Sequence, residues 1–245
     1  MNHRIIILPL LAVLLGCQSH EEIKLHHYAV DKSWKPKDTG LETLDPPHYR
    51  SDVYAPDREE NTVLADSFAC WLMEECGIAH NTDSIPEINK SFFLHEAEKQ
   101  MASDEDYKVD YLVRKVFESE HLITFVLEYG VDFYGAHGFY STHGATFLKA
   151  SGERLAWNMF RTTDGLQPLL KKGLDDYFSN GGQMAPEINP NALPMPNILW
   201  VEEEGIRMLY DSYEIASFAD GTPNFIISIE DAKPLLHPLA YEILR

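Results

Sequence analysis

The stretch "YKVDYLVRKVFESEHLITFVLEYGVDFY", residues 107–134, decides the fold class of this chain. Apolar side chains alternate with polar ones from Tyr107 to Val113, and again from Ile123 to Val131. Successive side chains of a strand point to opposite faces of its sheet, so each run predicts a strand with one buried face. The polar segment between the runs predicts a turn. Together they predict an antiparallel hairpin with long arms.

Two helices are predicted before this hairpin. In "NTVLADSFACWLMEECG", residues 61–77, apolar residues recur at helical spacing and Gly77 supplies a C-terminal stop. In "SIPEINKSFFLHEAEKQMA", residues 84–102, Ser84 and Glu87 form a capping-box pattern ahead of an apolar stripe.

The pattern continues after the hairpin with further strands and helices. It predicts a strand that turns at Ser151-Gly152, a helix over 164–182, a hairpin over 198–218 and a last strand over 224–230, after which 231–236 opens a short helix. Helices grouped around consecutive hairpins lack the strand–helix alternation of a parallel sheet. The sequence therefore predicts an α+β fold of antiparallel β-sheet hairpins with helices packed on one side.

The N-terminus predicts a cellular location. Arg4 precedes an apolar run of eleven residues, Ile5–Leu15, which is shorter than the roughly 20 residues of a membrane-spanning helix. The ending Leu-Leu-Gly-Cys resembles a bacterial lipobox, so residues 1–16 are predicted to be a lipoprotein signal peptide and Cys17 the acylated, palmitate-bearing residue. A plain signal peptide or an uncleaved anchor is the alternative. The predicted location is the bacterial cell envelope, at the outer membrane or cell surface in a Gram-negative organism.

The segment after Cys17 differs in composition from the rest. Residues 17–60 contain Pro36, Pro46, Pro47 and Pro56 without a sustained period, which predicts a Pro-rich tether that follows the lipidated N-terminus. The folded domain is then expected over 61–245, either as one unit or as two subdomains of about 61–140 and 141–245.

Charge and cysteines limit the possible partners. The chain has 39 acidic and 20 basic residues, a net charge of −19, which argues against nucleic acid and favours a basic partner. The alternative is that the acid excess only keeps the protein soluble. Cys70 and Cys76 are six residues apart, about 9 Å of rise on a continuous helix and beyond disulfide reach. Both thiols are expected to be free and buried unless the helix breaks before Cys76.

The segment around residues 132–144 could hold catalytic chemistry. Asp132, His137 and His143 could ligate a metal, which would make the protein a metal-dependent envelope hydrolase. The spacing is not that of a zinc-binding helix, however, and strand parity puts Asp132 and His137 on opposite faces unless the glycines rotate one of them. Ser141 lacks a nucleophile-elbow motif. The sequence therefore favours a protein that is not an enzyme and needs no cofactor.

An architectural interpretation explains the same segment. Its glycines, Gly130, Gly135, Gly138 and Gly144, allow positive φ or close backbone approach, and its aromatic rings could contact a partner. The predicted binding residues are Tyr134, Gly135, Ala136, His137 and Tyr140.

The order of several motifs resembles a known family. "INKSFF", the long hairpin, "YGAHG" at 134–138, "HGATFLKASGERLAWNMF" and "GIRMLYDSYEIASFADGTPNFIISIEDAKPLL" are similar to the extracytoplasmic domain of RsiV-type anti-sigma factors, over roughly residues 60–237. Similar domains accompany PdaC-type peptidoglycan deacetylases. Gly135, Ala136 and His137 match the family's Gly-Gly-Ala-His signature, with Tyr134 in place of its first glycine.

This resemblance implies a cell-envelope binding module, which in RsiV itself is a receptor for lysozyme. The chain has no predicted spanning helix or cytoplasmic sigma-binding region, so the anti-sigma route is not carried over. The predicted function is a lipid-anchored, non-enzymatic envelope protein that binds a lysozyme-like basic protein or a peptidoglycan fragment.

Overall fold

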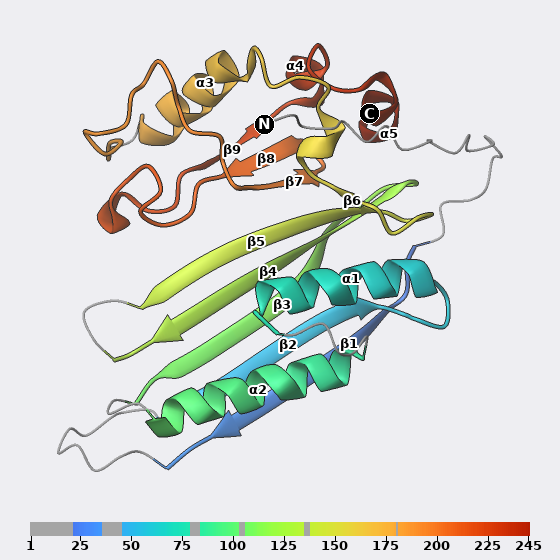
Figure 1. Ribbon diagram of the computed structural model, residues 1–245, viewed down its shortest axis with the longest axis vertical. Helices are drawn as coiled ribbons and strands as arrows, with labels where there is room; N and C mark the ends of the chain where they lie inside the picture. The colour runs from blue at the N-terminus through green and yellow to red at the C-terminus, as the bar shows by residue number, and fades with distance from the viewer. Residues whose placement is uncertain (1–21, 36–45, 79–83, 103–105, 135–137, 180) are drawn as a thin grey trace, which may run out of the picture.

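The computed structural model describes residues 22–35, 46–78, 84–102, 106–134, 138–179 and 181–245. Cys17, the predicted signal peptide and Gly135–His137 lie outside the described residues. The described chain forms a six-stranded sheet in the order β1-β2-β3-β4-β5-β6 and a three-stranded sheet in the order β7-β8-β9 (Figure 1). With the helices that cover these sheets, this arrangement confirms the predicted α+β class.

The six-stranded sheet contains the first half of the chain. Its strands are β1 (Leu25–Ser33), β2 (His48–Pro56), β3 (Lys108–Glu118), β4 (Leu122–Asp132), β5 (Phe139–Leu148) and β6 (Arg154–Leu155). Neighbours are antiparallel except β2 and β3, which are parallel. Parallel neighbours need a long crossover connection, and α1 (Thr62–Glu75) and α2 (Ile85–Ala102) provide it. The predicted hairpin over 107–134 is β3 and β4.

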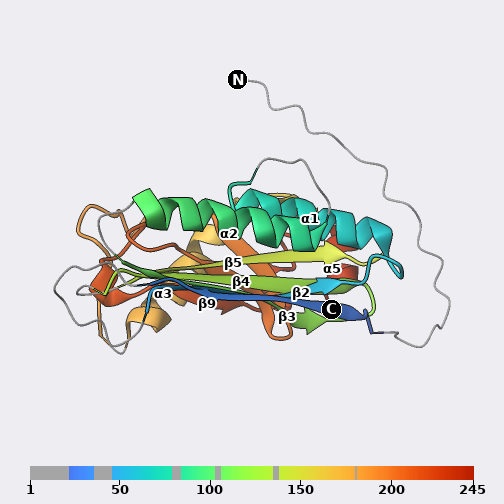
Figure 2. The same cartoon turned by 90° about the horizontal axis from the view of Figure 1, so that it is seen from below.

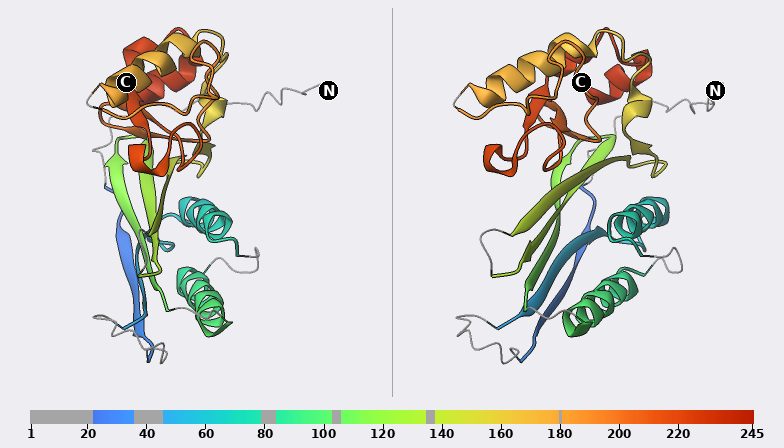
Figure 3. Two further views of the ribbon diagram at one scale, coloured as in Figure 1. Left: turned by 90° about the vertical axis from the view of Figure 1, so that its left-hand side faces the viewer. Right: turned by 60° about the vertical axis from the view of Figure 1, so that its left-hand side comes forward.

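Both crossover helices lie on one face of the large sheet, and no described helix covers the face opposite them (Figures 2 and 3). Asn61 caps α1, its side chain accepting a hydrogen bond from the backbone N–H of Leu64 at 3.0 Å. Buried rings fill the space between helices and sheet, and those of Phe68 and Phe125 lie 4.7 Å apart. This main core holds α1 and α2 in place by burying apolar surface.

The second half of the chain forms a layer at one end of the large sheet. It contains α3 (Leu166–Phe178), β7 (Ile198–Glu202), β8 (Gly205–Leu209), β9 (Asn224–Ile227), α4 (Ile229–Ala232), α5 (Pro238–Leu244) and two short 3₁₀ turns, Trp157–Met159 and Phe218–Asp220. Gly173 of α3 lets Phe225 approach closely, because a Cβ atom there would lie 2.1 Å from a ring carbon of Phe225.

The predicted division into 61–140 and 141–245 is wrong. β5 pairs with β4 over ten residues, from Leu122↔Leu148 to Val131↔Phe139. A boundary at residue 140 would therefore cut a strand of the large sheet. The chain leaves that sheet only after β6.

The predicted tether over 17–60 is wrong for residues 25–33 and 48–56, which pair as β1 and β2 along nine positions. The prolines do not oppose this pairing, because they lie before β2 or at its last residue, where a missing N–H disturbs no ladder. Alternate residues of β2, namely Tyr49, Ser51, Val53 and Ala55, are buried. The folded domain therefore begins before residue 61.

Both cysteines of the described chain are free thiols. Cys76 follows α1 without a break, its Sγ lies 2.8 Å from the Tyr111 hydroxyl, and burial raises its pKa to about 12. Cys70 is exposed, so the expected burial is wrong for that residue. Among the described helices, none combines the length and apolar character needed to cross a membrane.

Candidate ligand-binding groove

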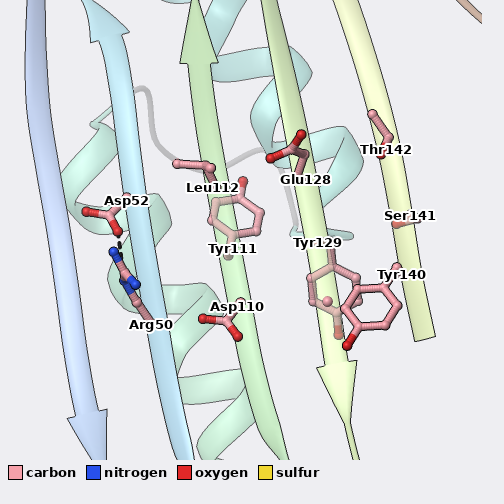
Figure 4. Close-up of a pocket in the computed structure, with 11 residues that line it drawn as sticks. Arg50, Asp52, Asp110, Tyr111, Leu112, Glu128, Tyr129, Tyr140, Ser141 and Thr142 are labelled. Atoms are coloured by element: carbon pink, nitrogen blue, oxygen red, sulfur yellow. Dashed lines mark hydrogen bonds and ion pairs between the residues drawn. The ribbon is translucent and has the colours of Figure 1, made fainter. Parts of the chain in front are cut away.

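The helix-free face of the large sheet carries a hollow of about 390 Å³ (Figure 4). Strand register builds it from two rows of side chains that cross β3, β4 and β5. The rows are Asp110, Gly130 and Tyr140, and then Leu112, Glu128 and Thr142. Arg50 and Asp52 of β2 close one side. Tyr111 and Tyr129, between the rows, point to the helix-covered face.

Two glycines form the seat of Tyr140. A Cβ atom on Gly130 would lie 3.0 Å from Cδ1 and Cε1 of the ring, and one on Gly138 would lie 3.0 Å from Cε2 and the hydroxyl oxygen. The ring therefore lies against bare backbone, while 58% of the residue remains exposed. An exposed ring supported in this way is a rigid contact surface.

A second hollow of about 450 Å³ continues the first toward the β7–β8 hairpin. Both are lined by Glu128 and Thr142, so the two hollows are neighbours on this face, and together they are here called the open groove. At its far end Trp200 of β7 lies over Gly144, where a Cβ atom would come within 2.3 Å of the indole. The turn residues Glu203 and Glu204 are exposed on its rim.

The open groove is acidic. It is lined by six carboxylates, Asp52, Asp110, Glu128, Glu202, Glu203 and Glu204, and by three arginines, Arg50, Arg114 and Arg207, a balance of −3. Each arginine contacts one of these carboxylates, at 3.0 Å for Arg50–Asp52, 2.6 Å for Arg114–Glu128 and 2.8 Å for Arg207–Glu202. Asp110, Glu203 and Glu204 therefore supply the excess negative charge.

The best-defined of these ion pairs joins Arg207 to Glu202. Two guanidinium nitrogens of Arg207 donate to the two carboxylate oxygens at 2.8 Å, and Trp200 Nε1 donates at 2.7 Å. Burial favours the neutral acid, but these hydrogen bonds outweigh it and lower the pKa of Glu202. Three hydrogen bonds thus hold the Glu202 carboxylate in place at this end of the groove.

The structure brings only part of the predicted binding set to this face. Tyr140 is in the groove. Tyr134 follows β4 with φ of 55°, and Lys108 Nζ lies 5.1 Å from the centre of its ring. Gly135, Ala136 and His137 lie outside the described residues, so their placement stays a prediction.

Two residues of the hydrolase alternative, His143 and Asp132, do not converge. His143 points to the helix side, where its Nδ1 lies 2.9 Å from a Glu75 carboxylate oxygen. Asp132 belongs to the opposite face by parity, and it accepts the backbone N–H of Tyr134 at 2.8 Å. No group of three potential metal ligands occurs among the described residues, which do not include His137. A shared site for His143 and Asp132 is therefore ruled out.

His143 instead borders a separate hollow of about 160 Å³ between α1, β5 and β7. The other oxygen of Glu75 accepts a hydrogen bond from Trp71 Nε1 at 2.9 Å. The hydrogen bond to Glu75 raises the pKa of His143, although burial opposes this. Ser141, the nearest β5 hydroxyl that shares the strand parity of His143, is two residues away. His143 and Glu75 therefore form an ion pair with a structural role.

Most of the groove was missed by sequence reasoning. Asp110 and Glu128 occupy polar positions of the alternating runs, and such positions are ordinarily solvated surface. Strand parity could have located these residues. Because the alternating buried residues of these strands are odd-numbered, the even-numbered Asp110, Gly130 and Tyr140 must share the other face. The β7–β8 contribution has no sequence signal, since it depends on how the two sheets pack.

No protein-family model matches the chain, and no curated protein matches it in sequence. Its fold is similar to that of solved proteins of the DUF3298 family. A member from Bacteroides fragilis NCTC 9343 is 16% identical, with a TM-score of 0.68 over 90% of this chain and 98% of that one. A protein from Pseudomonas aeruginosa PAO1 is 12% identical, with a TM-score of 0.62 over 90% of this chain and 97% of that one.

Proposed function

We propose that the protein is a lipid-anchored, non-enzymatic binding protein of the bacterial cell envelope, and that the open groove is its ligand-binding surface. The observation that carries this proposal is an acidic, ring-bearing hollow on a sheet face that no described helix covers. An exposed concave surface with an aromatic anchor and unbalanced charge is typical of recognition sites.

The ligand that best fits this surface is a basic protein. The lining carries a balance of −3, and the whole chain −19. Complementary charge accelerates encounter and selects partners. Lysozyme-like proteins enter the proposal through the resemblance to RsiV-type domains. A peptidoglycan fragment is the second candidate, because the exposed Tyr140 ring with neighbouring polar side chains could also contact a sugar ring.

Titration of the chain from Gln18 onward, which retains every described helix and strand, tests this proposal. Against lysozyme we expect saturable binding that weakens as salt rises from about 50 to 150 mM, because exposed charges are screened over about 8 Å at the higher salt. Soluble muropeptides are titrated in parallel. If only the muropeptides bind, peptidoglycan replaces lysozyme as the proposed ligand. If neither binds, both proposed ligands are rejected.

A charge-matched pair of variants locates the surface. Asp110→Asn with Glu203→Gln and Glu204→Gln removes the three excess carboxylates of the groove. Glu98→Gln with Asp176→Asn and Glu187→Gln removes three exposed carboxylates elsewhere and changes net charge equally. We expect only the first variant to weaken lysozyme binding, by at least about tenfold. Equal loss in both would mean that only net charge matters.

A further inference from the structure

The three residues of one row, Asp110, Gly130 and Tyr140, are Cα partners across β3, β4 and β5. The central position has no side chain. The ring of Tyr140 therefore lies over β4 beside Gly130, and Asp110 stands on the next strand, β3 (Figure 4). The row combines an aromatic ring, bare backbone and a carboxylate within the width of two strand spacings, about 10 Å.

The ring of Tyr140 offers one face to a ligand. Its other side rests on Gly130 and Gly138, with four ring or hydroxyl atoms at the 3.0 Å distances given above. A planar cation can stack on such a face, and the contact strengthens as water is excluded.

Asp110 remains available for a ligand. Its side chain is 61% exposed, and its ion-pair partner is His48 Nε2, at 3.9 Å. Arg50 is its register neighbour, but the guanidinium of Arg50 is directed to Asp52 at 3.0 Å. His27 also donates toward Asp52 at 3.0 Å, so Asp52 is the carboxylate already engaged.

We propose that this row is a subsite for the guanidinium of an arginine side chain on the partner. The guanidinium would stack on Tyr140 and donate two parallel hydrogen bonds to Asp110, while its aliphatic stem would pass over Leu112. Arginine fits better than lysine, because it is planar and presents paired donors, whereas an ammonium is a compact point charge. This inference rests on the proposed function, in that the open groove is taken as the binding surface.

The experiment uses N-acetyl-L-arginine amide and the chain from Gln18 onward, followed by ¹H–¹⁵N NMR. We expect saturable shifts of the Asp110, Gly130 and Tyr140 amides. N-acetyl-L-citrulline amide has nearly the same shape without the charge and should cause much smaller shifts. Asp110→Asn should weaken arginine-amide binding about tenfold and Tyr140→Leu about threefold. Tyr140→Phe should retain most of it, and Asp176→Asn serves as the charge-matched control.

The outcomes separate this inference from the proposed function. Arginine-amide shifts that map elsewhere, or equal binding by citrulline amide, would overturn the subsite. So would lysozyme affinity that is the same in Asp110→Asn as in Asp176→Asn, and in that case the groove could still be the lysozyme site. Conversely, if the arginine amide binds at the row but lysozyme does not bind, the subsite is supported and the proposed protein ligand is rejected.

Discussion

Glycines in β4 and β5 allow aromatic side chains to approach the sheet closely. Sequence alone left two roles open for Gly130, Gly138 and Gly144, positive φ or close backbone approach. None of the three has positive φ, and each lies under a ring, Tyr140 over the first two and Trp200 over the third. Sequence could not choose between these roles, because the partner of Gly144 is 56 residues away and lies in the other sheet.

This difference in partners predicts different costs for two matched substitutions. Gly144→Ala places a methyl group 2.3 Å from the indole of Trp200, which is 3% exposed and cannot move freely. We expect a loss of about 2 kcal/mol in the free energy of unfolding, measured in urea. Gly130→Ala meets the exposed Tyr140 ring at 3.0 Å, and the ring can shift, so the loss should be below about 1 kcal/mol. Equal costs would contradict the close packing of Trp200.

The His143–Glu75 pair predicts a pH-dependent contribution to stability. The hydrogen bond to Glu75 raises the pKa of His143, and Asp211 adds to the effect. A raised folded-state pKa gives stability that is complete below the unfolded value of about 6.5 and is lost as pH rises through the folded value. Burial opposes ionisation of Glu75, but hydrogen bonds from His143 and Trp71 lower its pKa, so its contribution is lost only in acid.

His143→Gln should therefore cost about 1 kcal/mol more at pH 6 than at pH 9, measured by chemical unfolding. The control is the same substitution in a Glu75→Gln background, where the pH-dependent part should vanish. A pH-independent cost in the wild-type background would show that His143 contributes only packing.

Among the elements, those with a strong period or cap were predictable. α1 begins directly after its cap Asn61, α2 begins directly after Ser84 of the predicted capping box, and β3 and β4 follow the alternation of 107–134. β1 and β2 were missed for two physical reasons. β1 is an edge strand in which every position is exposed or half-buried, so it carries no apolar period. β2 buries Ser51 within its alternating set, which interrupts the apolar pattern.

The pairing of β1 with β2 predicts slow hydrogen exchange where a tether would exchange at once. In exchange monitored by mass spectrometry, peptides covering 25–33 should be protected, although less than those covering β4, because one edge of β1 is unpaired. Peptides from the irregular segment 186–192 serve as the fast-exchanging comparison. If residues 25–33 exchange as fast as that segment, they behave as the predicted tether and not as a paired strand.

At the scale of the whole molecule, the predicted lipid at Cys17 would attach the protein to a membrane, and the groove would act beside that membrane. Cys17→Ser should abolish incorporation of labelled palmitate and release the protein from the membrane pellet, because the sulfur that carries the lipid is gone. Cys70→Ser, which changes the exposed free thiol of α1, is the matched control and should leave both unchanged. Labelling that persists in Cys17→Ser would contradict the lipobox prediction.

The contacts of residues 22–24 determine where such an anchor would hold the domain. The backbone N–H of Ile23 donates to Glu118 at the end of β3, at 2.8 Å. The Asp110 row lies eight residues back along the same strand, about 26 Å away. Five residue steps separate Cys17 from Glu22, a reach of about 18 Å at most. A lipid there would tether one end of the sheet closely to the membrane. The groove would then stay within a short distance of the bilayer surface and would meet partners confined to that layer.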